Sequence, residues 1–286
     1  MATIRQINRR IKSVRNTSKV TKAMEMIAAS KMRRAQERTL ASRPYAEKIC
    51  QVLADLAAQT RVGEEGHPLL IKRPVNKIAV IHITPDRGLC GGLVANVNRN
   101  VARFIMDHKG TPVANVAVGR KGRDFMLRSG QQVRAEFINM SDKPSVSDIL
   151  PVARIVVDDY CAGLVDEVYI SYTQFVNTVS QKPAIVKLLP IEPAVFEAGK
   201  NNEYIYEPTP QEVMSELLPR FIEMSLYHSL LEAIASEQSA RMVAMRNATD
   251  NAHELIGELT LKYNKARQEM ITKELLDIVG GVAALE

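Results

Sequence analysis

The sequence of 286 residues predicts an α/β domain inserted between two long terminal helices that form a coiled coil. Apolar or small side chains recur every three or four positions through about the first sixty and the last eighty residues. Between these segments, short β-branched runs alternate with helical ones, which is typical of a mostly parallel sheet. We therefore divide the chain into a first helical segment at 1–74, an α/β domain at 75–207 and a last helical segment at 208–286.

The last helix is expected over about 210–280, a stretch with little glycine and one internal proline, Pro219. Its apolar stripe starts at Val213 and ends with Met270, Leu275 and Ile278. About seventy helical residues would reach roughly 105 Å at 1.5 Å per residue. A helix of that length is not typical of a compact domain and indicates a shaft or coiled coil. Its expected partner is the first helix.

The first helix is expected from residue 3 to 38 and on to about residue 60, with a bend at Pro44. Four small polar residues interrupt its stripe, where a packed seam would normally be apolar. We expect the helix to contact something other than its partner at that level. The interrupting residues are Asn16, Thr17, Ser18 and Thr21, and the apolar side is marked by Ile4, Ile7, Ile11, Val14, Val20, Met24 and Ile27.

The charge of the chain is unevenly placed. Residues 1–38 hold eleven Lys or Arg and two Glu, a net charge of +9, whereas the whole chain carries +6. The remainder is therefore slightly acidic. A basic segment predicts an acidic partner, which could be nucleic acid, anionic lipid or an acidic protein loop, and the alternative is a solvated helix face.

The middle of the chain predicts a mostly parallel, Rossmann-like α/β sheet with an antiparallel edge. A hairpin through Asn177, Thr178 and Val179 should join the last two strands, and a polar connection follows at 192–208. Strands are expected at 77–84, 113–119, 132–138, 167–175 and 184–189, and helices at 93–108, 122–129 and 148–163.

Several classes of protein are disfavoured. Cys50, Cys90 and Cys161 are odd in number and widely spaced, so we expect neither a disulfide framework nor a zinc site, and a reducing compartment fits. No run approaches the roughly twenty apolar residues of a membrane span. The N-terminus is charged and has no apolar signal region, so any membrane role should be peripheral.

One loop carries a possible chemical signal. The segment 86–93 (DRGLCGGL) is rich in glycine and lies between a predicted strand and helix, where phosphates bind in α/β sheets. It matches neither the P-loop nor the dinucleotide fingerprint. A tight turn, or an Arg87 that holds a partner's carboxylate, explains it equally well, and Cys90 has no histidine at a suggestive spacing. We predict no catalytic, cofactor-binding or metal-binding residue.

Four stretches together closely resemble the gamma subunit of F-type ATP synthases, and they lie in that family's order. They are IKSVRNTSKVTKAMEMIAASKM at 11–32, DRGLCGGL at 86–93, SEQSARMVAMRNATDNA at 236–252 and YNKARQEMITKELLDIVGG at 263–281. The likeness is greatest to bacterial members, since chloroplast members carry a regulatory cysteine pair and 196–210 has no cysteine.

The resemblance implies a central rotor that couples transmembrane proton flow to ATP synthesis or hydrolysis and regulates it. In this family the terminal helices form an antiparallel coiled coil inside a ring of three alpha and three beta subunits. The α/β domain lies at the membrane-side foot beside epsilon and the c-ring. Nucleotides bind on alpha and beta, so the chain would be non-catalytic, without cofactors, and peripheral on the cytoplasmic side of a bacterial cell membrane.

The resemblance also implies roles for single residues. Lys19, Lys22 and Met24 match positions that face an acidic lever loop of beta. Positions that contact beta near a catch loop are matched by Arg267, Gln268 and Thr272, with Arg87 in a motif near the same region and Arg241 at a position implicated in coupling. The foot near the c-ring is matched by Tyr204, Tyr206 and Glu207.

Two alternatives remain open from the residues alone. The basic first helix fits a coiled-coil protein that binds nucleic acid, although residues 1–38 offer no aromatic platform for stacking single strands. The loop at 86–93 fits a degenerate nucleotide-binding enzyme.

Overall fold

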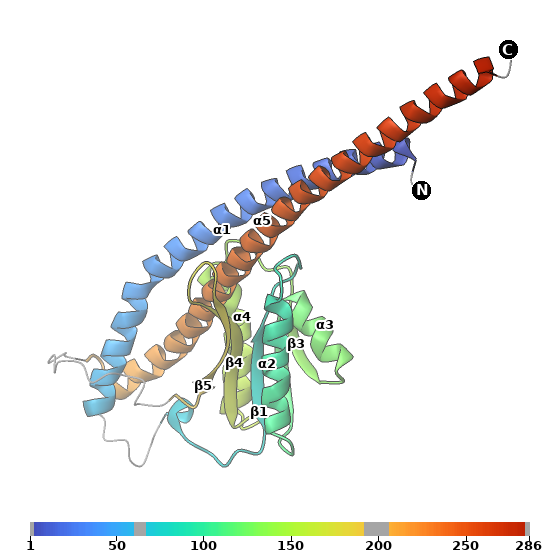
Figure 1. The fold of residues 1–286 in the computed structure, drawn as a ribbon. Coiled ribbons are helices and arrows are strands. Elements are labelled where there is room, and N and C mark those ends of the chain that lie inside the picture. Colours follow the sequence, from blue (N-terminus) through green and yellow to red (C-terminus); the bar gives the residue numbers. More distant parts are fainter. Residues whose placement is uncertain (1–2, 60–66, 192–205, 284–286) are drawn as a thin grey trace. The chain divides into compact units, whose positions relative to one another are not determined.

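The computed structural model describes residues 3–59, 67–191 and 206–283, which form two compact units. The first unit contains residues 1–28 and 241–286, and the second contains residues 29–240. The elements, labelled in Figure 1, are α1 (Ile4–Gln59), the 3-10 turn η1 (Pro68–Leu70), β1 (Ile78–Ile83), α2 (Leu93–Asp107), β2 (Val113–Val118), α3 (Arg120–Arg128), β3 (Val133–Phe137), α4 (Val146–Cys161), β4 (Glu167–Phe175), β5 (Gln181–Leu189) and α5 (Pro210–Ala283).

The sheet of the second unit has the strand order β3-β2-β1-β4-β5 (Figure 1). The pairs β3–β2, β2–β1 and β1–β4 are parallel, whereas β4 and β5 are antiparallel. This confirms the expected parallel sheet with an antiparallel edge. The strand β1 lies at the centre, and its six residues are all buried because helices cover both faces of the sheet.

Alternate residues of β1 face two separate cores, as a strand requires. Ile78 and Val80 pack with residues of α2 and α3 in the smaller core. Ile81 and Ile83 belong to the larger core, which takes residues from α4 and from parts of both long helices. The contributions from the long helices include Ile49, Leu53 and Leu56 of α1 and Leu218, Ile222 and Leu226 of α5. The sheet domain is thus packed on helix segments that belong to the same unit.

The expected helix at 148–163 starts earlier, at Val146. The reason is a capping box: the Asp148 carboxylate accepts a hydrogen bond from the Ser145 backbone N–H at 2.8 Å. Asp148 is therefore the third helical residue and not the first. This hydrogen bond also lowers the pKa of the Asp148 carboxyl.

The hairpin between β4 and β5 forms where it was expected. The Asn177 side chain accepts hydrogen bonds from the backbone N–H groups of Val179 and Ser180 at 2.9 and 2.7 Å. Pairing resumes at once, with Phe175 opposite Gln181, so β5 begins three residues before the predicted start at Ala184. The internal prolines of the two long helices, Pro44 and Pro219, lie inside helices that continue past them.

Within the described residues, no helix combines the length and the apolar character needed to cross a membrane.

One buried histidine links several elements on the side of the sheet that packs against α2 and α3. His82 on β1 is fully buried, with its Nε2 2.9 Å from Asn98 Oδ1 on α2 and its Nδ1 3.2 Å from Ser171 Oγ on β4. A Cβ atom at Gly122 would come within 2.7 Å of the imidazole, so α3 packs closely on the same ring. Burial lowers the pKa of His82 to about 4. The neutral imidazole therefore joins three elements.

We expect the stability of the second unit to fall as His82 is forced to take up a proton. Its pKa is lower in the folded than in the unfolded chain, so its contribution is complete above about pH 6.5 and is lost between pH 6.5 and 4. The shift corresponds to at most roughly 3 kcal/mol. Urea unfolding of wild type and His82→Gln at pH 7, 5.5 and 4 measures it: the difference between the two proteins should shrink as the pH falls. A difference that stays constant over this range would show that His82 does not remain neutral.

Candidate functional site

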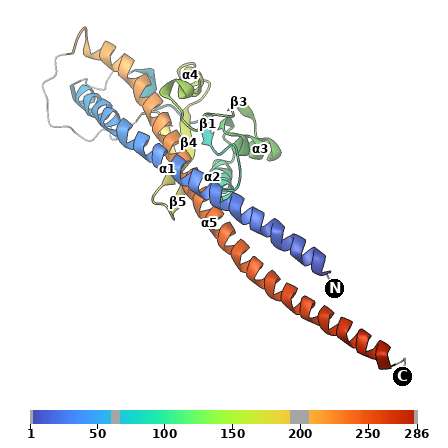
Figure 2. The ribbon, with the colours of Figure 1, turned by 90° about the horizontal axis from the view of Figure 1, so that it is seen from above.

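The helical unit is an antiparallel pair made from the start of α1 and the end of α5 (Figures 1 and 2). Three contacts fix the register. Ser18 Oγ lies 3.2 Å from His253 Nε2, the hydroxyls of Thr21 and Thr249 are 2.7 Å apart, and Arg246 Nε donates to Glu25 at 3.1 Å. Residue numbers rise along α1 as they fall along α5, so the predicted antiparallel coiled coil is confirmed for these segments.

The polar residues in the middle of the first helix lie inside this seam. Ser18 and Thr21 are buried, with exposed fractions of 5% and 9%. The expectation that they contact something other than the partner helix is wrong, because α5 places Thr249 and His253 at the same level and satisfies their hydroxyls. A seam can hold polar residues where both helices supply them.

The apolar stripe predicted for the first helix is partly wrong. Val20 and Ile27 are 58% and 55% exposed. The buried face instead keeps a strict alternation of three and four residues from Ile4, and at 18, 21 and 25 that alternation falls on polar side chains. The sequence would have predicted this buried face if the steps of three and four residues had been continued through the polar positions.

Sequence reasoning missed Glu25, the most buried charge of the helical unit. Its side chain is 8% exposed and accepts from Lys22 Nζ at 3.0 Å and from Arg246 Nε at 3.1 Å. The hydrogen bond from Lys22 lowers the pKa of the Glu25 carboxyl most, with Arg246 acting in the same direction against desolvation. Glu25 is therefore a satisfied buried anion between two cations.

The predicted lever-loop residues lie in this part of the pair. Lys22 directs its ammonium group to Glu25 of its own helix, and its side chain is still 56% exposed. Lys19 is exposed and Met24 is half-buried. Both lysines are therefore accessible to a partner protein.

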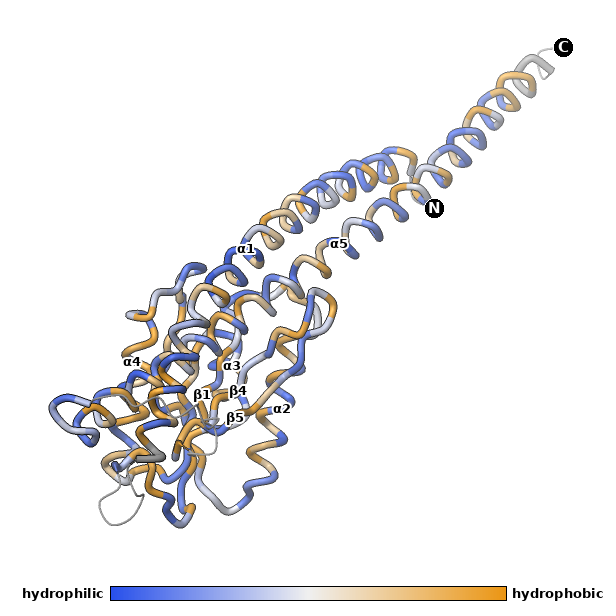
Figure 3. The backbone as a smooth tube through the Cα atoms, turned by 90° about the vertical axis from the view of Figure 1, so that its left-hand side faces the viewer, coloured by the Kyte–Doolittle hydropathy of each residue, from blue (hydrophilic) through white to orange (hydrophobic). Residues whose placement is uncertain are grey.

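The end of α5 runs past the start of α1 (Figure 2). If the register of the three contacts continues, Ile4 lies opposite about residue 267. Among the α5 side chains that the structure describes, up to residue 279, the last buried one is Leu259. Roughly 16 further residues, about 24 Å at 1.5 Å per residue, then extend alone. Hydrophobic and hydrophilic residues alternate along this free end (Figure 3). Its exposed apolar residues are Met270, Ile271, Leu275, Leu276, Ile278 and Val279.

The predicted catch-loop residues lie on the same free end. Arg267, Gln268 and Thr272 are all exposed. The Thr272 hydroxyl donates to the Gln268 carbonyl oxygen at 2.9 Å, so part of its hydrogen-bonding capacity is used within the helix. The stripe of Met270, Leu275 and Ile278 beside them is not covered by any described part of this chain.

The glycine-rich loop between β1 and α2, which carries Arg87, belongs to the second unit. The Asp86 carboxylate accepts from the Arg120 N–H at 2.9 Å, and Leu89 and Gly91 have φ angles of 64° and 60°. Gly91 permits the turn that the sequence indicated. Arg87 is exposed, while Cys90 is 2% exposed, a poor position for a nucleophile.

The other predicted residues are dispersed. Arg241 is half-buried at the start of the α5 segment of the helical unit. In the second unit, Tyr206 is half-buried against the larger core and Glu207 is exposed. Tyr204 lies outside the described residues. In the described ranges no group of three or more His, Cys, Asp or Glu could hold a metal ion.

Sequence reasoning also missed two attachments of the sheet domain to helix segments of its own unit. Ser236 and Ser239 of α5 donate to the carbonyl oxygens of Thr173 and Thr178 at 3.0 and 2.7 Å, which ties the β4–β5 hairpin to the helix. The Pro144 carbonyl oxygen accepts from Arg38 of α1 at 3.1 Å and from Tyr227 of α5 at 3.2 Å. The sequence signal for the first attachment was the pair Ser236 and Ser239, two small hydroxyl residues three positions apart on a helix.

A family model described as ATP synthase matches residues 3–285. An ATP synthase gamma chain of Dehalococcoides mccartyi strain CBDB1 is 65% identical over 285 residues, which span 100% of both chains. Another from Roseiflexus castenholzii is 53% identical over 288 residues, covering 100% of this chain and 99% of the relative. The chain belongs to the family of ATP synthase gamma chains. The resemblance seen in the four stretches is thereby confirmed, and the nucleic-acid-binding alternative is not supported.

Solved structures agree with this family. A chain of the central stalk and c-ring of the Tetrahymena thermophila mitochondrial ATP synthase has a TM-score of 0.61 and 26% identity, covering 80% of this chain and 99% of that one. A chain of the Euglena gracilis mitochondrial ATP synthase in rotational state 3 has a TM-score of 0.68 and covers 99% of this chain and 94% of that one. At 21% identity, the second likeness shows the fold.

In this gamma chain, the contacts of Glu25 predict that replacing it costs more unfolding free energy than replacing an exposed glutamate. Glu25→Gln removes the buried anion and leaves Arg246 and Lys22 without it, so urea unfolding followed by helical circular dichroism should show a loss of roughly 1–3 kcal/mol. The control is Glu37→Gln, which breaks an exposed pair with Arg33 and should cost at most about 0.5 kcal/mol. Equal losses in both variants would show that the seam network is no more than surface charge.

Proposed function

We propose that the chain is the central rotor shaft of a proton-translocating ATP synthase, coupling proton flow to ATP synthesis or hydrolysis and regulating it. The observation that carries this proposal is the free end of α5. Six large apolar residues there are 45% to 66% exposed. A contiguous apolar surface of this kind marks an interaction site. The proposed ring of three alpha and three beta subunits would enclose it.

The mechanism rests on unequal contact. One shaft cannot present the same side chains to three identical beta subunits at once. Whichever subunit meets the polar patch of Arg267 and Gln268 gains interactions that the other two lack. A difference in contact energy shifts the conformational equilibrium of that subunit, and rotation passes the shift to the next.

Catalysis in this proposal takes place on other subunits. The chain supplies shape and contact, whereas nucleotides bind on alpha and beta, without a cofactor on this chain. Membership of the gamma-chain family supports this assignment. The buried Cys90 and the loop at 86–93, which turns tightly through Gly91, also fit a structural role better than a nucleotide site.

We assign the chain's parts as follows. The helical segments 1–74 and 208–286 form the shaft, and the α/β domain 75–207 forms the foot beside epsilon and the c-ring, on the cytoplasmic side of the cell membrane. The Tetrahymena chain comes from a structure described as central stalk and c-ring, which supports this arrangement. Contacts with beta are assigned to Lys19, Lys22, Met24, Arg87, Arg241, Arg267, Gln268 and Thr272, and contacts with the c-ring to Tyr204, Tyr206 and Glu207.

Two substitutions on the free end test the proposal. Arg267→Ala and Gln268→Leu should leave the unfolding of the isolated chain unchanged, because both side chains are exposed. In the assembled complex each should lengthen one class of rotational dwell, since an unpaired partner group costs roughly 1–3 kcal/mol. Single-molecule rotation measures the dwells. Lys265→Ala is the control, because it removes an exposed charge about 200° around the helix from Arg267.

Dwell times that match the wild type in both variants would rule out a catch role for this patch.

A further inference from the structure

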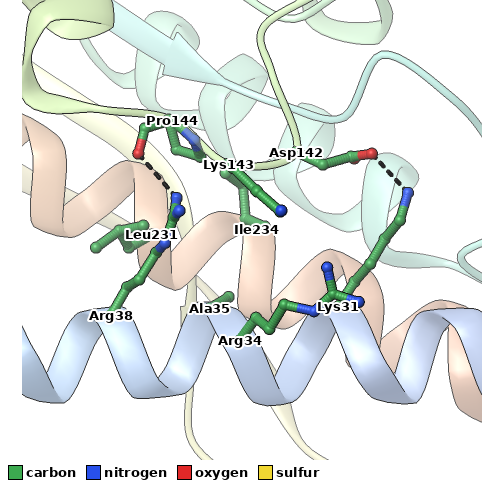
Figure 4. Close-up of a pocket in the computed structure, with 9 residues that line it drawn as sticks. All are labelled: Lys31, Arg34, Ala35, Arg38, Asp142, Lys143, Pro144, Leu231 and Ile234. Carbon is green, nitrogen blue, oxygen red and sulfur yellow. Dashed lines mark hydrogen bonds and ion pairs between the residues drawn. The ribbon is translucent and has the colours of Figure 1, made fainter.

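A small cationic cavity lies in the second unit, where α1, α5 and the loop at 142–144 meet (Figure 4). Its volume is about 100 Å³. Four of its lining residues are cations, and Asp142 is the only anion among them, so the lining carries a net charge of +3. The cations are Lys31, Arg34, Arg38 and Lys143.

The described residues leave most of this positive charge uncompensated. Lys31 donates to Asp142 at 2.5 Å, while Arg38 and Arg34 donate to uncharged groups, the Pro144 carbonyl and the Ser30 hydroxyl. The Lys143 ammonium group makes no hydrogen bond or ion pair with any described residue. An Arg has five donors and a Lys three, so each cation keeps donors for a ligand.

The cations come from two different segments and converge. Figure 4 shows Lys143 reaching from the loop, and Arg38 from α1, into the space between these segments. Leu231 and Ile234 of α5 form an apolar wall, and Leu231 is fully buried. Arg34, Asp142 and Lys143 are exposed at the mouth of the cavity, whereas Lys31 and Arg38 are half-buried. The cations therefore attract an anion from solvent, and their attraction is strongest beside the apolar wall.

We propose that this cavity binds a single hydrogen phosphate ion. A cavity of this kind needs about 10–15 Å³ to hold one water, so this one has room for several waters or for one tetrahedral oxyanion. Nucleotides need pockets of roughly 300 Å³ or more. Charge-assisted hydrogen bonds from Arg34 and Lys143 would hold the ion, with Lys31 and Arg38 completing the cationic lining.

Asp142 gives the site a preference for phosphate over other anions. A carboxylate in the wall repels sulfate and acetate, which at neutral pH present only acceptor oxygens. Hydrogen phosphate carries a proton that it can donate to the Asp142 carboxylate, turning the repulsion into a hydrogen bond.

A bound phosphate would also connect α1 to the loop at 142–144. Since ATP synthesis consumes phosphate, occupancy would follow substrate supply, a link that rests on the proposed function.

Calorimetric titration of the full chain with inorganic phosphate, at ionic strength held constant with chloride, tests the site. We expect saturable binding to one site. Arg34→Gln combined with Lys143→Gln should weaken it by at least about tenfold. The matched control, Arg33→Gln with Lys182→Gln, removes two exposed cations that do not line the cavity and should change affinity by no more than about twofold.

Parallel titrations with sulfate and acetate identify the ligand. Phosphate should bind more tightly than either, and Asp142→Asn should reduce that preference by favouring sulfate. Absence of saturable binding, equal weakening in the cavity and control variants, or tighter binding of acetate or sulfate than of phosphate would overturn the proposal. No turnover is measured, so a failure here leaves the rotor function untouched.

Discussion

The register between α1 and α5 in the helical unit determines which surface the chain offers to other proteins. An apolar seam alone can slide by one heptad at little cost. The buried contacts of Ser18, Thr21 and Glu25 with α5 prevent this, because any slip would leave buried polar groups without partners. Once the register is fixed, the position at which α1 begins and beyond which α5 continues alone is fixed as well. The free apolar end is a consequence of the polar seam.

In the second unit, the sheet domain is attached to the long helices by both apolar packing and hydrogen bonds. This domain must remain attached to helix segments of its own unit under load. Leu218, Ile222 and Leu226 of α5 are buried in the larger core and so pack the sheet domain onto the helix. Hydrogen bonds from Ser236 and Ser239 to the hairpin backbone, and from Arg38 and Tyr227 to Pro144, add direction to that contact. Backbone carbonyls are rigid acceptors, so these bonds resist sliding of the hairpin and the loop along the helices.

Much of the fold could be predicted because its elements carry strong periodic signals. A run of β-branched residues predicts the central strand, and apolar residues spaced three and four apart predict the long helices. The start of α4 was misplaced because it depends on one capping hydrogen bond from Ser145 to Asp148. Val20 and Ile27 were misassigned because an apolar side chain can lie beside a seam whose own positions are polar.

The candidate site was less predictable for a related reason. The roles of Glu25 and Ser236 depend on the groups that the fold brings opposite them, Arg246 and the Thr173 carbonyl. Neither partner is close in sequence. Arg267, Gln268 and Thr272 could be placed on the last helix, but their position on its free end follows only from the register with α1.

We expect the free end of α5 to be exposed in the isolated chain and enclosed in the complex. Replacing Leu275 with cysteine and following maleimide alkylation of its peptide by mass spectrometry tests this directly. Leu275 is 58% exposed, so the isolated chain should react rapidly. In the assembled complex the same cysteine should react at least about a hundredfold more slowly, because water and reagent would be excluded from a packed bearing. Equal rates in the isolated chain and the complex would contradict the claim.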